Sequence, residues 1–312
     1  MTENSFQLRK VRDFGERIGD AVLFTRINWV NLLILYAVFV VPFLLIGIIL
    51  GANSISDFLT KFTGGLDSLS GLLGWKMITA TIMFLLASAS YAAVVYLYMD
   101  QFETNHGQKP TISEIGNQYP RALIYNIGYT LLVVILFIPV MLLIAGMAIA
   151  LKAQLAIFLL AIPLLFLLGL FAMVYIMMIY PVNIIGKGRF GTALGETFRL
   201  LHGRWWFSIG YFFVLLIIYY FFAMAISTIF NVIFGLTAIN FTDPNRITRM
   251  GKGFMYVFGL TTLVQQVFYL IIFAGTGIHY YSTQEEKMGT GLEEKIDQLG
   301  ISPGQKTDNE QY

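Results

Sequence analysis

The chain has 312 residues, of which 57% are hydrophobic and only 12% charged, and its mean hydropathy is +0.72. Soluble domains carry about 25% charged residues, so this composition excludes an ordinary water-soluble globular protein. The sequence contains no cysteine, which excludes disulfides and thiolate catalysis, and its net charge of +2 provides no basic field for nucleic acid.

The N-terminal segment is charged and has no early apolar stretch, so we expect it to be retained rather than cleaved as a signal peptide. Phe14, Ile18 and Val22 are spaced as one face of a helix, with Arg17 and Asp20 elsewhere around it. This pattern predicts an amphipathic helix at the membrane interface, with its charged side chains directed to water or to lipid headgroups.

Six apolar runs follow, each of about 20 residues or more, which is long enough to cross a bilayer as a helix. The runs are solid rather than alternating, so they favour helices over a barrel. The predicted spans are Trp29–Gly51, Met77–Met99, Ile124–Leu151, Leu155–Tyr180, Phe207–Leu236 and Met255–Tyr281. Prolines within the spans, such as Pro42, predict kinks.

The distribution of Lys and Arg predicts the orientation. The segments on one side of the spans hold 14 of these residues and those on the other side hold 6, which places both termini in the cytoplasm of a multi-pass protein of the bacterial cytoplasmic (inner) membrane. The predicted organisation is a cytoplasmic N-terminal segment (1–28), a six-helix transmembrane domain (29–281) and a cytoplasmic tail with a short helix (282–312).

A sequence repeat divides the chain into three similar units. "FGERIGD" at 14–20 and "FGTALGE" at 190–196 align with a third copy, "TISEIGN" at 111–117, which brings Gly19, Gly116 and Gly195 into register. The predicted fold is therefore an all-α polytopic membrane protein, in which six transmembrane helices form three hairpins, each preceded by a cytoplasmic amphipathic interfacial helix. We expect the repeated glycine to allow close helix approach, so that Gly195→Leu disrupts the bundle.

The motifs "FGERIGD" and "FGTALGETFRLLHGRWW", together with the order of cytoplasmic helix and hairpin, resemble the six-span bacterial families around the glycerophosphodiester phosphodiesterase membrane domain. The resemblance covers residues 14 to 281 and implies a membrane module without the hydrolase, because in that family the catalytic domain is a separate soluble barrel. The tail "EEKMGTGLEEKIDQLG" is similar to tails of uncharacterised membrane proteins of Bacteroidetes.

Polar residues divide into two predicted groups. Residues at the interface are candidates for lipid or partner contacts: Arg17, Trp29, Lys187, Arg189, Arg199, Arg204, Trp205 and Trp206. Residues inside the spans are candidates for interhelical hydrogen bonds: Asn231, Gln265 and Gln266. All acidic residues fall outside the predicted spans, which counts against a proton relay.

No hydrolase, metalloprotease or nucleotide-binding motif occurs, so we predict no catalytic residue, cofactor or metal. The preferred function is a non-enzymatic membrane component that binds or organises a membrane or cytoplasmic partner, with membrane lipids and another protein subunit as partners. The alternative is a transporter, channel or lipid flippase for a neutral or lipid-like substrate. A lipid-acting membrane enzyme is a third class, for which the only candidates are His106, Glu196, His202 and Arg204.

Overall fold

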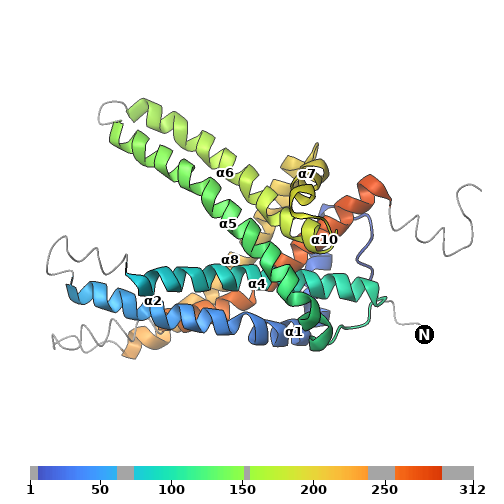
Figure 1. Ribbon diagram of the computed structural model, residues 1–312, viewed down its shortest axis with the longest axis horizontal. Coiled ribbons are helices and arrows are strands. Elements are labelled where there is room, and N and C mark those ends of the chain that lie inside the picture. Colours follow the sequence, from blue (N-terminus) through green and yellow to red (C-terminus); the bar gives the residue numbers. More distant parts are fainter. Residues whose placement is uncertain (1–5, 62–73, 151–154, 238–256, 290–312) are drawn as a thin grey trace, which may run out of the picture.

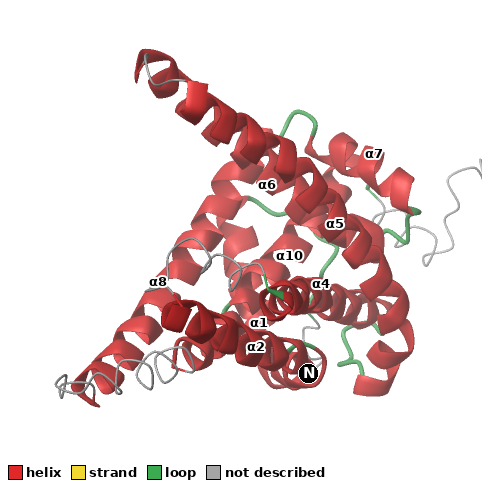
Figure 2. Cartoon of the chain, turned by 60° about the vertical axis from the view of Figure 1, so that its left-hand side comes forward, coloured by secondary structure: helices red, strands yellow, loops and turns green. Residues whose placement is uncertain are grey.

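The computed structural model describes residues 6–61, 74–150, 155–237 and 257–289. Every regular element in this part of the chain is a helix (Figure 2). The helices are α1 (Phe14–Phe39), α2 (Val41–Lys61), α4 (Trp75–Thr104), α5 (Ile112–Ala150), α6 (Leu155–Ile184), α7 (Phe190–Leu201), α8 (Trp205–Thr237) and α10 (Tyr269–Met288). A further helical segment, 257–267, leads into α10.

Two helices are buried at the centre of the bundle. Residues 91–100 of α4 are all buried, and so is nearly every residue of α10 from 270 to 283. Small residues allow this close packing: a Cβ added to Gly277 would lie 2.3 Å from Met99 Sδ. At one end of the bundle, α10 packs with α7 and with the last part of α4 (residues 91–104). The ends of α1, α5, α6 and α8 adjoin them there, and we call this region the hub.

Helix pairs extend away from the hub as arms (Figure 1). α2 lies along the first half of α4, and α5 lies along α6 in a second arm that diverges from the first. Segment 257–267 lies against α8, where Gln265 Nε2 donates to the Ala223 carbonyl at 2.9 Å. The outward faces are apolar, with Phe221 on α8 71% exposed and Val30 on α1 65% exposed. A bilayer would solvate such faces, whereas water would not.

Five described helices are long and apolar enough to cross a membrane. They are Phe14–Phe39, Trp75–Thr104, Leu167–Ile184, Trp205–Ile233 and Val257–Met288, and Val41–Ser54 is a shorter apolar helix. The predicted span Ile124–Leu151 falls on α5, most of whose later side chains lie outside the described part. The predicted tail helix after residue 289 lies outside it entirely.

The predicted interfacial helices are separate elements in only one of the three units. α1 continues without a break from Phe14 to Phe39, so the predicted domain boundary at residue 28 falls inside a helix, and the second unit is likewise continuous with α5. α7 is separate because His202 leaves the helical conformation and Gly203 adopts a φ of +78°.

The break between α1 and α2 falls at Val40, two residues before Pro42. Val40 has φ −111° and ψ −47°, at the edge of helical geometry. The cause is local, because the Pro42 ring clashes with the carbonyl four residues earlier and the proline nitrogen has no hydrogen to donate. The kink expected at this proline therefore interrupts the long N-terminal helix near its midpoint.

Candidate functional site

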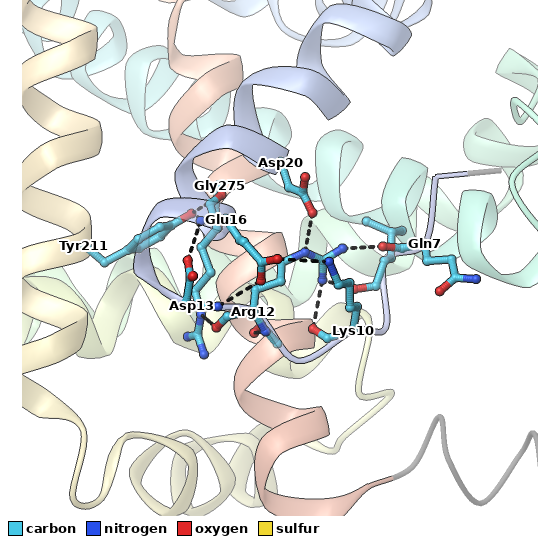
Figure 3. Close-up of polar contacts among 11 residues, drawn as sticks. Gln7, Lys10, Arg12, Asp13, Glu16, Asp20, Tyr211 and Gly275 are labelled. Carbon is cyan, nitrogen blue, oxygen red and sulfur yellow. Dashed lines mark hydrogen bonds and ion pairs between the residues drawn. The ribbon is translucent and has the colours of Figure 1, made fainter. Parts of the chain in front are cut away.

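The N-terminal segment is bound to the end of α10 through Arg12. The Arg12 backbone N–H donates to Ser282 Oγ at 3.0 Å, and its Nε donates to Asp20 Oδ2 at 2.6 Å. The rest of the guanidinium donates to backbone carbonyls, including that of Lys10 at 3.0 Å and that of Gln7 (Figure 3). Arg12 thus folds the segment back on itself and fixes it to α10.

A capping box starts α1 directly after this segment. The Glu16 backbone N–H donates to Asp13 Oδ1 at 2.7 Å, and the Asp13 N–H donates to Glu16 Oε2 at 3.1 Å (Figure 3). Reciprocal capping satisfies two backbone donors that a helix start otherwise leaves unpaired. It also fixes the rotation of the first turn, and therefore the direction in which Arg17 projects.

Arg17 is fully buried and every nitrogen of its guanidinium has a partner. Nη1 lies 2.8 Å from His279 Nδ1 and donates to Thr283 Oγ1 at 3.1 Å. Nη2 donates to Glu286 Oε2 at 2.8 Å, and Nε donates to the Arg12 carbonyl at 3.1 Å. We call the arginine cluster the set Arg17, Arg204, Ser208, His279, Thr283 and Glu286.

His279 lies at the centre of this cluster with both ring nitrogens engaged. Arg17 can only donate, so His279 Nδ1 accepts and Nε2 carries the hydrogen that is donated to Ser208 Oγ at 2.9 Å. The Tyr211 ring stacks on the imidazole with a centroid separation of 4.8 Å, and the Phe207 ring is nearly parallel to it at 6.0 Å. The ring is therefore held in one tautomer and covered by aromatic side chains.

The last turns of α10 connect three other segments. Glu286 Oε2 accepts from Arg17 Nη2 and also from Arg204 Nη1, each at 2.8 Å. Lys287 Nζ donates to the carbonyls of Arg199 and His202, at 2.7 and 2.8 Å, where α7 ends. A cation at this position also interacts favourably with the C-terminal end of the α7 dipole.

The arginine cluster is suited to fixing structure rather than to reacting with a substrate. The guanidinium nitrogens of Arg17 and both ring nitrogens of His279 are paired within the chain, and the Phe207 ring centroid lies 4.7 Å from the guanidinium carbon of Arg17. A buried ion pair is tolerated when hydrogen bonds satisfy its remaining polar atoms, and loss of one partner leaves a charge without compensation. The cluster therefore ties α1, α8 and α10 together at the hub.

The burial of Arg17 corrects the expectation that it reaches water or headgroups. The side chain is 0% exposed because the capped first turn directs it toward α10 instead of outward. The sequence does carry a signal for its partners: His279, Thr283 and Glu286 are spaced at i, i+4 and i+7, on one face of α10. That polar face predicts a cationic partner but does not say which one.

The other predicted interfacial residues lie around the surface of the hub. Those that are exposed are Lys187, Arg189, Arg199 and Trp206, and those that are half-buried are Trp29, Arg204 and Trp205. Arg199 pairs with Glu196 on the same helix, and Trp205 packs against Phe171 with a centroid separation of 5.3 Å.

The predicted intramembrane polar residues differ from one another. Gln265 Nε2 donates to Ser227 Oγ at 2.9 Å in addition to the Ala223 carbonyl, which joins segment 257–267 to α8. Gln266 is half-buried, and its backbone carbonyl accepts from the Tyr91 hydroxyl at 2.8 Å. Asn231 lies on the exposed side of α8.

The residues considered for lipid chemistry do not converge. Glu196 pairs with Arg199, Arg204 pairs with Glu286, and His202 caps the end of α7. His106 lies in the turn after α4 with a φ of +52°. Among the described residues, no group of three or more His, Asp or Glu side chains is arranged to hold a metal ion.

Comparison with protein-family models, with curated proteins and with solved structures finds no match to the chain. The class of this protein therefore follows from its fold. The described part of the chain has an all-helical fold and includes five candidate membrane-spanning helices. Several long apolar helices of this kind are typical of a multi-pass membrane protein.

Proposed function

We propose that the chain is a non-enzymatic integral component of the bacterial cytoplasmic membrane that binds or organises a membrane or cytoplasmic partner. In this proposal it crosses the bilayer six times in three hairpins, with both termini and the hub on the cytoplasmic side. Its partners are membrane lipids and another protein subunit. A relationship to the six-span families around the glycerophosphodiester phosphodiesterase membrane domain is part of the proposal and rests on the repeated motifs.

The observation that carries the proposal is the closed arginine cluster. It joins the ends of α1, α8 and α10, while Lys287 attaches α7 to the same base. On this base α7 buries Ala193 and Leu200 and leaves Phe198 55% exposed beside the exposed Arg199. A rigid helix that presents apolar and basic side chains suits binding, because little conformational freedom is lost on contact.

The contact surface can be tested by site-specific photocrosslinking in native membranes. We expect a photoreactive residue at Phe198 to give a crosslinked protein band of defined mass. The control position is Phe213 on α8, which is 58% exposed on the predicted lipid-facing part of the chain. Identical patterns at the two positions, or lipid adducts alone at both, would contradict binding of a protein through α7.

The proposed orientation can be tested because the chain has no native cysteine. Gly74 and Gln108 flank the two ends of α4, so single cysteines at these positions should lie on opposite sides of the membrane. A membrane-impermeant thiol reagent applied to intact cells should label the Gly74→Cys variant and leave the Gln108→Cys variant unlabelled. The reverse labelling would invert the proposed topology.

A cavity in one arm favours the second candidate, a transporter or flippase for a neutral or lipid-like substrate. Its volume is about 390 Å³ and its lining is almost entirely apolar, and it includes Gly47, Gly51, Ala80, Phe84 and Phe258. An apolar cavity of this size accommodates part of an acyl chain. Under this candidate, Ala80→Phe should fill the cavity and slow lipid translocation in reconstituted vesicles, whereas equal rates would count against it.

A further inference from the structure

A second polar assembly lies at the hub and shares no residue with the arginine cluster. It is a cavity of about 350 Å³ between α4, α5 and α6. Its polar lining consists of Asp100, Asn117, Gln118, Arg121, Asn183 and Lys187. Both signs of charge are present in one small space, which distinguishes this cavity from the apolar cavity in the arm.

The carboxylate and its cation differ in their freedom to move. The side chain of Asp100 is 10% exposed, so its carboxylate is nearly buried in the wall of the cavity. Lys187 Nζ lies 3.6 Å from Asp100 Oδ2, yet the Lys187 side chain is 71% exposed. The lysine can therefore turn toward a ligand at the mouth of the cavity, provided that another cation takes its place beside Asp100.

The backbone that carries Lys187 is held in place. Lys187 itself adopts a φ of +52°, a left-handed conformation that residues other than glycine adopt infrequently. Asn183 stabilises the turn, since its Nδ2 donates to the Gly188 carbonyl at 3.1 Å and to the Tyr129 hydroxyl at 3.2 Å. The position of the lysine at the mouth is thus built into the fold.

Arg121 supplies a second cation and marks the start of an apolar track. Its guanidinium carbon lies 5.9 Å from the Tyr125 ring centroid. On α5, Arg121 shares one face with Ile124, Leu131 and Ile135, which follow at +3, +10 and +14. These three side chains are 68, 50 and 61% exposed, so apolar surface leads from the cavity along the helix.

We propose that this cavity binds the headgroup of an aminophospholipid of the phosphoethanolamine type. Lys187 and Arg121 bind the phosphate, the primary ammonium pairs with Asp100, and an acyl chain lies along Ile124 and Leu131 on α5. The inference rests on the membrane placement in the proposed function, but not on the identity of any protein partner.

The carboxylate decides between lipid classes. When Lys187 turns to a phosphate, Asp100 loses its paired cation, and the remaining cation that acts on this carboxylate, Arg9, is itself paired with Glu103. A nearly buried carboxylate that has lost its ion pair is costly. The ammonium of the aminophospholipid restores that pair, whereas an anionic headgroup such as phosphoglycerol leaves it broken. A choline headgroup has no N–H to donate, and several aromatic rings bind it best. The lining of this cavity includes the ring of Tyr125, which alone is a poor site for choline.

Native mass spectrometry of the purified full chain tests the proposal with three dioleoyl lipids that differ only in headgroup. We expect dioleoylphosphatidylethanolamine to bind about tenfold more tightly than the phosphatidylcholine and phosphatidylglycerol forms, the size of one charged hydrogen bond. Asp100→Asn should abolish this preference. Lys187→Gln changes an exposed side chain and should weaken phosphatidylethanolamine binding by about tenfold.

Glu196→Gln is the matched control, because it removes an exposed carboxylate that lies outside the cavity and should leave all three affinities unchanged. Tightest binding of phosphatidylglycerol, or a preference that survives Asp100→Asn, would overturn the proposal. Soluble O-phosphoethanolamine separates the two sources of this headgroup: competition as strong as that of the lipid would overturn the lipid assignment. Any of these failures would leave partner binding through α7 unaffected, since crosslinks at Phe198 measure that separately.

Discussion

At the scale of single residues, Arg17 sets the energetics of the hub. Arg17→Met leaves Glu286 with one of its two cations and leaves His279 Nδ1 without a donor. Breaking a buried pair by removing one partner costs about 3–5 kcal/mol. We therefore expect a clear fall in the melting temperature of the purified protein, followed by intrinsic tryptophan fluorescence.

Arg199→Met is the matched control for that experiment. Its guanidinium pairs with Glu196 but is 63% exposed, so its loss should change stability by less than about 0.5 kcal/mol. Equal melting temperatures for the Arg17 and Arg199 variants would show that the buried cluster contributes no more than a surface ion pair.

His279 and Ser208 should behave as a coupled pair. Ser208→Ala leaves the Nε2 hydrogen of His279 without an acceptor, and His279→Leu leaves the Ser208 hydroxyl without its partner. Each single change should destabilise the protein by about 1–3 kcal/mol. The double variant should lose at least about 0.5 kcal/mol less than the sum, because the second change removes a group already left unpaired. If the losses measured in denaturant melts are simply additive, the hydrogen bond between Ser208 and His279 does not contribute to the stability of the folded protein.

At the scale of helices, the space around each glycine shows whether that glycine lies at a close contact between helices. The repeat led us to expect Gly195 at a close contact, but nothing lies within 4 Å of a Cβ added there, and the expectation about its packing was wrong. At Gly259, by contrast, an added Cβ would lie 2.2 Å from Ile48 Cγ2 on α2. The close approach of segment 257–267 to α2 therefore depends on a glycine outside the aligned motif.

Alanine substitutions at these two glycines should act in opposite directions. Gly195→Ala should stabilise the protein by about 0.5–1 kcal/mol, because it removes the entropic cost of glycine in the exposed side of α7. Gly259→Ala should destabilise it by about 1–3 kcal/mol, because Ile48 is branched at Cβ and cannot move aside freely. Melting temperatures that shift in the same direction for both variants would contradict these assignments.

The sequence predicts the helical elements better than it predicts their contacts. The physical reason is that helix signals act between residues close in the sequence, whereas the contacts join residues far apart in it. Solid apolar runs and a proline act over a few residues, so the helices and the break before Pro42 follow from local sequence. Arg17 contacts His279, which lies 262 positions away in the sequence, and the cavity combines Asp100 on α4 with Lys187 in the turn between α6 and α7. Lys187 was predicted as a headgroup contact from its charge alone, but its carboxylate partner depends on how α4 and α6 pack.

At the scale of the whole molecule, the last turn of α10 should decide whether the hub assembles. A chain ending after Gln284 lacks Glu286 and Lys287, so it loses the contacts to Arg17, Arg204 and the end of α7. A chain ending after Met288 keeps them all. We expect the shorter chain to release α7 from the hub and the longer chain to melt like the full-length protein.

Ala193 provides the readout for this comparison. Its side chain is fully buried on α7, so an Ala193→Cys variant should resist a thiol reagent in permeabilised membranes when α7 is docked. The chain has no other cysteine, so any labelling reports this position alone. We expect fast labelling in the chain that ends at Gln284 and slow labelling in the chain that ends at Met288. Equal protection in both would mean that packing of Ala193 and Leu200 holds α7 without the ionic contacts of α10, and that the surface proposed for partner binding does not depend on the arginine cluster.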